Sequence, residues 1–138
     1  MVRMSELANF AERYTAAWNS GDPARVAALH ERESSLRVND AEPAIGHEAI
    51  TEVARGFMTG FPDMELHMDG IEGDETSAVY RWTFVGTNTG PGGTGHAVDF
   101  SGYEEWTLNQ EGLITRSLGH FDAAEYERQL AGGKTAAS

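Results

Sequence analysis

The chain lacks cysteine entirely and has few cationic side chains, and each shortage excludes classes of protein. With no cysteine among 138 residues, a disulfide framework, a thiolate nucleophile and a cysteine-type zinc site are all excluded. The chain has ten Lys and Arg residues and 22 Asp and Glu residues, which gives a formal net charge of -12. Nucleic acids and anionic membranes, in contrast, bind cationic surfaces. No apolar run approaches the roughly 18 residues that span a bilayer. We therefore expect neither nucleic-acid nor membrane partners.

The start of the chain also lacks the apolar stretch of a secretory signal. Residues 1–5 lead directly into a polar, periodic segment, so we expect a cytoplasmic protein. The length fits one domain over residues 1–138, with an ordered core of about 5–130.

Helical periodicity dominates the first 60 residues. Residues 5–19 place apolar side chains three and four positions apart, on one face of a helix. Asp22 and Pro23 are a typical N-cap and first-turn pair, and they predict a short second helix to about residue 30. A third helix is predicted from about His47 to Gly60, because Pro62 follows it.

The later part of the chain changes to a period of two, which indicates strands. Alternation predicts strands over residues 34–39, from 64 to a turn at 73, and over 77–87, 97–108 and 113–120, with a short helix over 123–130. Helices followed by an antiparallel meander favour an α+β fold. A curved, mostly antiparallel sheet that closes over three helices would form a cone with an apolar interior, which suits a small ligand.

Seven short motifs occur in an order that points to one family. They are residues 18–22 (WNSGD), 46–50 (GHEAI), 61–64 (FPDM), 81–83 (RWT), 86–90 (GTNTG), 100–102 (FSG) and 121–122 (FD). With them the chain resembles the SnoaL-like polyketide cyclases of the NTF2-like superfamily, which includes ketosteroid isomerases, over roughly residues 7–130. The resemblance implies the NTF2-like cone, a hydrophobic small-molecule ligand, no cofactor, and a homodimer through the convex face of the sheet.

Two acidic residues are the first candidates for acid/base chemistry. The resemblance places Asp122 where the cyclases have the general acid/base of an aldol cyclisation, but Asp122 also fits an N-cap, with Glu125 at capping-box spacing. Strand parity puts Glu104 on an apolar face, and the isomerases hold a protonated acid at the comparable position. The alternatives are that Glu105 points inward instead, or that an arginine pairs with Glu104.

Three further residues are candidates for catalysis. Tyr14 lies on the apolar face of the first helix and resembles the oxyanion-hole tyrosine of the isomerases; the alternative is a core tyrosine whose hydroxyl bonds a neighbour. Asp40 lies in the loop where the isomerases keep their general base, although Asp is common in loops. His120 is a candidate pH-sensitive partner of Asp122.

The candidates for ligand contacts are mostly aromatic: Trp18, His30, Phe57, Phe61, Arg81, Trp82, Phe84 and Trp106. Arg81 has two open orientations. It could point inward, toward Glu104 or a substrate carboxylate, or outward on the predicted dimer face. The five histidines lack the spacing of metal ligands, so no metal site is expected.

The leading hypothesis is an enzyme that acts on a hydrophobic carbonyl compound by cyclisation or isomerisation. Asp122 would remove a proton next to the carbonyl, and Tyr14 or Glu104 would stabilise the enolate. The rival hypothesis is a non-catalytic ligand-binding or accessory dimer protein. It draws support from Asn88 and Ser117, because members of the family often have histidine at these two positions.

Overall fold

The computed structural model describes residues 4–74 and 76–133 and contains four helices there. They are α1 (Met4–Asn19), α2 (Pro23–Ala27), α3 (His47–Gly60) and α4 (Ala123–Gly132). The apolar face predicted for α1 is buried over its whole length, at Leu7, Phe10, Ala11, Tyr14, Ala17 and Trp18. The prediction that the second helix continues to about residue 30 is wrong, because α2 ends at Ala27 and His30 already begins a strand.

The described strands form one mixed, six-stranded sheet. They are β1 (His30–Val38), β2 (Ala44–Ile45), β3 (Glu65–Gly73), β4 (Ser77–Thr87), β5 (Ala97–Leu108) and β6 (Ile114–Phe121), in the order β2-β1-β6-β5-β4-β3. The predicted antiparallel meander from β3 to β6 is confirmed, and β1 joins it by pairing parallel to β6. The two-residue strand β2 was not predicted.

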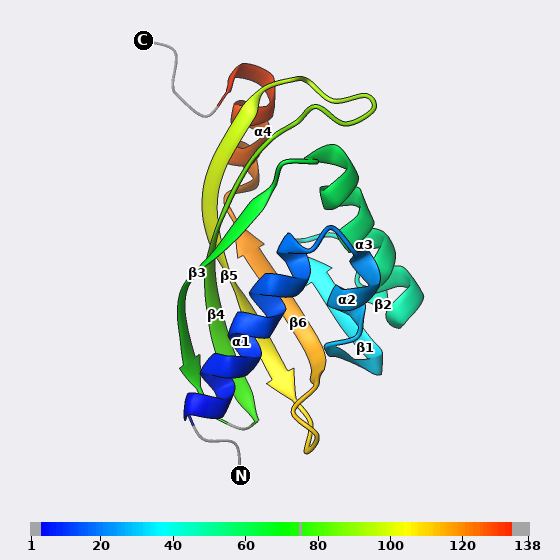
Figure 1. The fold of residues 1–138 in the computed structure, drawn as a ribbon, viewed down its shortest axis with the longest axis vertical. Helices are drawn as coiled ribbons and strands as arrows, with labels where there is room; N and C mark the ends of the chain where they lie inside the picture. The colour runs from blue at the N-terminus through cyan, green and yellow to red at the C-terminus, as the bar shows by residue number, and fades with distance from the viewer. Residues whose placement is uncertain (1–3, 75, 134–138) are drawn as a thin grey trace.

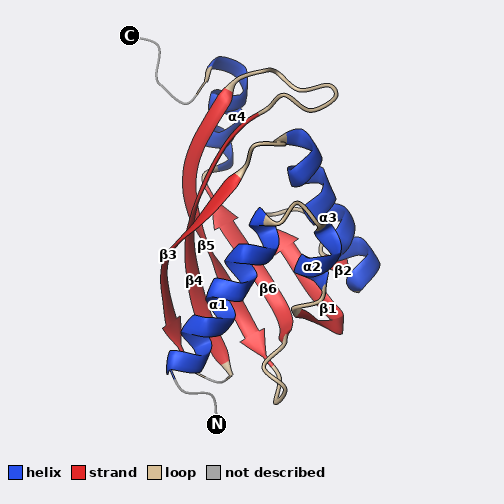
Figure 2. Cartoon of the chain, viewed as in Figure 1, coloured by secondary structure: helices blue, strands red, loops and turns tan. Residues whose placement is uncertain are grey.

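The helices cover one face of this curved sheet. In Figure 1, α1 crosses the concave face, while α2 and α3 lie beside it near β1 and β2. Figure 2 shows α4 at the far end of the molecule, where it packs against β5. The α+β cone predicted from the element order is therefore confirmed, with α4 as a fourth helix after the sheet. None of the helices in the described residues is long and apolar enough to cross a membrane.

Alternation along β4 and β5 separates the concave face from the convex one. On β4 the buried residues are Ala78, Tyr80, Trp82 and Phe84, and on β5 they include Val98, Phe100, Glu104 and Trp106. The residues between them point to the convex face. Glu104 thus lies on the concave face, as its strand parity predicted.

Gly102 makes room on this concave face. A Cβ atom at Gly102 would lie 2.7 Å from Cζ2 of Trp82 and 2.3 Å from the backbone oxygen of His120. Only a residue without a side chain lets the Trp82 ring pack directly on β5.

Candidate active site

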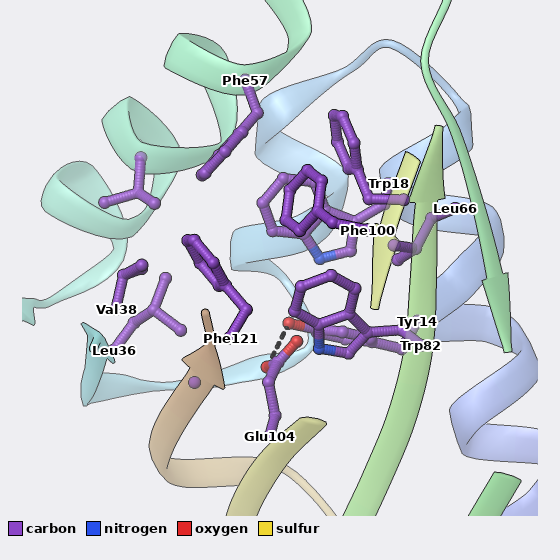
Figure 3. A pocket seen from close by; sticks show the side chains of 13 residues that line it. Tyr14, Trp18, Leu36, Val38, Phe57, Leu66, Trp82, Phe100, Glu104 and Phe121 are labelled. Carbon is purple, nitrogen blue, oxygen red and sulfur yellow. Dashed lines mark hydrogen bonds between the residues drawn. The ribbon is translucent and has the colours of Figure 1, made fainter. Parts of the chain in front are cut away.

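An apolar cavity of about 60 Å³, partly open to the surface, lies on the concave face between α1, α3, β1 and the rest of the sheet. Its wall is aromatic and aliphatic, and Figure 3 shows side chains from these elements turned toward one another. Tyr14 and Glu104 are the titratable groups among the described lining residues. The space holds a few water molecules, so a larger ligand must displace side chains.

The Glu104 carboxyl group is held by three hydrogen-bond donors that meet on one of its oxygens. The Tyr14 hydroxyl donates to Oε1 at 2.7 Å, the Ser117 hydroxyl at 2.7 Å and the Trp106 Nε1–H at 3.1 Å. The Tyr14 bond is the dashed line in Figure 3. None of the three bonds uses Oε2.

Burial dominates the electrostatics of this pair. Desolvation raises the pKa of Glu104, and the hydrogen bonds from Tyr14, Ser117 and Trp106 partly oppose it by stabilising the carboxylate. Desolvation, together with the nearby Glu104 charge, raises the pKa of Tyr14 well above its usual value. Tyr14 therefore stays a neutral donor, and Glu104 binds its proton more tightly than an exposed glutamate does.

Ring packing fixes the orientation of the donors. The Tyr14 ring meets the Trp106 ring edge-on, with centroids 4.8 Å apart, and Tyr80 stacks on Trp106 at 4.9 Å. Such contacts leave little freedom for the side chains. The Tyr14 hydroxyl and the Trp106 N–H are thus positioned before any ligand binds.

The structure places Asp122, Asp40 and His120 outside this cavity. They line a separate, more open and polar hollow together with Arg37. Asp122 is exposed and caps α4, since its Oδ1 accepts the Glu125 N–H at 3.0 Å.

The other two acid/base candidates in the hollow have polar partners of their own. Asp40 is exposed and lies 3.6 Å from Arg37. His120 faces the convex side, where its Nε2 is 2.7 Å from Oε1 of Glu105. His120 therefore contacts Glu105 and not Asp122, as the sequence had suggested, and Asp122 does not point into the cavity.

The predicted ligand contacts divide into three groups. Trp18, Phe57, Trp82 and Phe84 line the cavity. Phe61, Trp106 and His30 are buried in the surrounding interior, with His30 beside Tyr14 at a ring distance of 6.2 Å, but they are not part of the lining. Arg81 lies on the convex face, where its Nη2 is 3.0 Å from Oε1 of Glu72.

Sequence reasoning missed several residues that shape the site. Ser117 was noted only as a departure from the family, yet it donates to Glu104. Phe121 and the pair Leu36 and Val38 line the cavity. The alternation of Leu36 with Val38 was the signal that could have found that pair.

The described residues contain no group of three or more His, Asp or Glu side chains that could hold a metal ion. The tyrosine, carboxyl and indole groups at the cavity are instead suited to proton transfer and hydrogen bonding.

Comparison with known proteins places the chain in a family. Residues 8–130 match the family model described as SnoaL-like polyketide cyclase. No match is found among curated protein sequences.

Solved structures share the fold at low sequence identity. TsrD from Streptomyces laurentii is 22% identical, with a TM-score of 0.80 over 94% of this chain and 98% of that one. An NTF2-like protein from Burkholderia pseudomallei K96243 is 19% identical, with a TM-score of 0.79 over 94% and 100%. SalBIII, an epoxide hydrolase/cyclase-like enzyme with a role in pyran ring formation in the polyether salinomycin, is 14% identical, with a TM-score of 0.77 over 90% and 96%. The fold is thus NTF2-like, and the chain belongs to the SnoaL-like polyketide cyclase family.

Proposed function

We propose that this protein is a small-molecule enzyme that uses Glu104 as its acid/base group on a hydrophobic carbonyl compound. The observation that carries the proposal is the position of the Glu104 carboxyl group, which lies buried at an apolar cavity with three donors on one oxygen. The outcome for the substrate is an aldol-type ring closure or an isomerisation. Glu104 takes the role first expected of Asp122, which is exposed and caps α4.

The proton moves through Oε2 of Glu104. When the carboxyl group is ionised, Oε2 accepts a proton from the carbon next to the substrate carbonyl, and the C–H electron pair becomes the enolate. In an isomerisation, Oε2 returns the proton to a different carbon of the enolate. In an aldol closure, the enolate carbon attacks a second carbonyl group of the substrate, and the proton goes to the oxygen of that group. Donors on Oε1 keep the carboxyl group in one orientation throughout, so Tyr14 and Ser117 act as positioning residues.

Enolisation without a known substrate is measured with a probe ketone. Acetophenone is incubated with the full chain in D₂O, and the replacement of its methyl protons by deuterium is followed by ¹H NMR. Glu104→Gln should lower the enzyme-dependent exchange rate 10²-fold or more, because the amide cannot take up the proton. Asp122→Asn keeps a capping side chain and should stay within about threefold of wild type.

Glu105→Gln is the matched control for charge and position. Glu105 is the next residue on β5 but faces the convex side, where it contacts His120. Its variant should exchange at the wild-type rate. Circular dichroism of all three variants establishes that each is folded. The assignment would be contradicted if Asp122→Asn lost deuterium exchange while Glu104→Gln kept the wild-type rate.

The alternative is a ligand-binding protein without catalysis. It is favoured by the same three donors, since a buried carboxylate that accepts three hydrogen bonds can serve structure alone. ¹³C NMR titration of Glu104 separates the two proposals: a pKa near the ordinary glutamate value of about 4.3 supports binding. A raised pKa together with exchange that Glu104→Gln abolishes supports the enzyme.

The homodimer remains a prediction. We propose that it forms through the convex face, which carries half-buried Val79 and Val85 and exposed Tyr103. Sedimentation equilibrium at micromolar concentration tests it, and a mass of 15.0 kDa, that of one chain, would contradict it.

A further inference from the structure

Two tryptophans of the cavity wall have a buried indole N–H group that finds no hydrogen-bond partner among the described residues. Trp18 and Trp82 line the cavity and are each only 8% exposed, yet their Nε1 atoms are buried and unpaired. The N–H of Trp106, in contrast, donates to Glu104. A buried donor without an acceptor costs about 1–3 kcal/mol of stability. These two N–H groups therefore lack acceptors in a wall that is otherwise apolar.

Both indoles lie next to the proposed acid/base group. Trp18 follows Tyr14 by one turn of α1, with ring centroids 6.4 Å apart. The Trp18 side chain also lowers the pKa of Tyr14 and so partly opposes the effect of burial. Trp82 packs over Gly102. Figure 3 shows the Trp82 ring beside the hydrogen bond between Tyr14 and Glu104, with the Trp18 ring farther from that bond.

We infer that Trp18 and Trp82 are the residues that recognise the ligand's oxygen, and that they donate hydrogen bonds to a carbonyl group. An indole N–H only donates, so the pair selects an acceptor and gives no advantage to a hydrocarbon or an ammonium group. This inference deepens the proposed function and rests on it for the location of the site.

The small volume of the cavity fits this assignment. At about 60 Å³, it must widen before a whole ring-sized ketone lies inside it, and widening costs packing contacts. Hydrogen bonds from two donors that are otherwise unpaired offset part of that cost, whereas a ligand without an oxygen leaves both donors unpaired. The two unpaired donors thus favour a carbonyl ligand.

The test uses the three indole N–H resonances of the full chain, one for each tryptophan. ¹H–¹⁵N spectra are recorded during titration with acetophenone and with α-methylstyrene, in which a CH₂ group replaces the oxygen in the same shape. We expect acetophenone to shift the Trp18 and Trp82 protons downfield, as a new hydrogen bond does, while Trp106 keeps its bond to Glu104. The hydrocarbon should cause no downfield shift.

Two variants quantify the selection. Trp18→Phe and Trp82→Phe keep an apolar ring but remove the N–H, and they also assign the resonances. Each should lower the preference for acetophenone over α-methylstyrene, measured as the ratio of the two Kd values, by about 2–10-fold, the worth of one neutral hydrogen bond. Taking the ratio cancels the general loss of packing in the smaller ring.

Two results would overturn the inference: equal shifts with both compounds, or no shift with acetophenone up to its solubility limit. Neither depends on turnover. If Glu104→Gln exchanges deuterium as fast as wild type while the indole shifts follow the carbonyl, the catalytic proposal fails and the recognition by Trp18 and Trp82 stands.

Discussion

The two faces of the central strands carry opposite chemistry, although their residues alternate along the same chain. On the concave face, one carboxyl group, that of Glu104, is buried among aromatic rings. On the convex face, polar and charged groups pair with each other in contact with water, as Arg81 does with Glu72 and His120 with Glu105. Glu104 and Glu105 are adjacent in sequence and differ in nearly every physical respect.

The difference shows how an acidic chain can give one carboxyl group an environment unlike that of the others. Exposed carboxylates have low proton affinity at neutral pH because water and nearby cations stabilise the charge. Burial removes that stabilisation and raises the pKa of Glu104. Most of the 22 acidic residues therefore contribute charge at the surface, while Glu104 is the acidic residue that we propose for chemistry.

The contrast between buried and exposed titratable groups predicts its largest effect at the buried His30, which should make the stability of the fold depend on pH on the acid side. Burial, and to a lesser extent the nearby His47, lowers the pKa of His30 to about 4. In the unfolded chain, His30 takes up a proton below about pH 6.5, whereas the folded protein keeps it neutral down to about pH 4. The free energy of unfolding therefore has its full value above about pH 6.5 and decreases as the pH falls from about 6.5 to about 4. The gap corresponds to about 3 kcal/mol.

Urea unfolding between pH 4 and 7 measures this loss. His30→Gln should show a shallower decline on the acid side than wild type. His67→Gln, on an exposed position of β3, leaves His30 in place and should keep the decline. Parallel curves for wild type and His30→Gln would mean that His30 is not held neutral by the interior.

A methyl group added to the concave face should have the next largest effect. Gly102→Ala forces its Cβ against the His120 backbone oxygen and the Trp82 ring, and overpacking of this kind costs about 2 kcal/mol. The matched change is Gly56→Ala on α3, where the new Cβ meets open space and a helix gains about 0.5–1 kcal/mol. Urea unfolding at pH 7 should therefore give changes of opposite sign. Equal stabilities would show that β5 yields at this point.

Removing one hydroxyl from each face gives a smaller contrast. Tyr14→Phe deletes a donor to Glu104 and should cost about 1 kcal/mol. It should also raise the pKa of Glu104 further, because the lost bond stabilised the carboxylate. Tyr103→Phe, on the convex face, should change neither stability nor the Glu104 titration. ¹³C NMR of the glutamate side chains follows the pKa, and an unchanged Glu104 titration in Tyr14→Phe would remove Tyr14 from its positioning role.

The sequence predicted the faces better than it predicted the contacts between them. The inward position of Glu104 followed from alternation along one strand, and the buried face of α1 followed from the helical period. From the sequence, Asp122 fitted both a helix cap and a catalytic acid. Its position after β6 in the structure shows that it caps α4.

Irregular backbone explains what alternation could not predict. The register between β5 and β6 shifts near Leu108, so Ile114 pairs out of step with Arg116 and the residues after it. Simple alternation along β6 would place Ile114 and His120 on the same face of the sheet. In the structure, Ile114 is buried and His120 faces the convex side. The bond from Ser117 to Glu104 depends on that same register, which no single strand encodes.

The smallest effect belongs to the convex face itself. Arg81 donates to Oε1 of Glu72 from Nε and Nη2, at 3.2 and 3.0 Å, but both side chains are more than half exposed. A double-mutant cycle of Arg81→Ala and Glu72→Ala should give a coupling of about 0.5 kcal/mol, because water screens exposed pairs. In 1 M NaCl the coupling should fall toward zero. A coupling above about 2 kcal/mol that persists in salt would mean that this face is desolvated in solution, as a dimer interface would be, and the contrast between the two faces would then hold for the monomer alone.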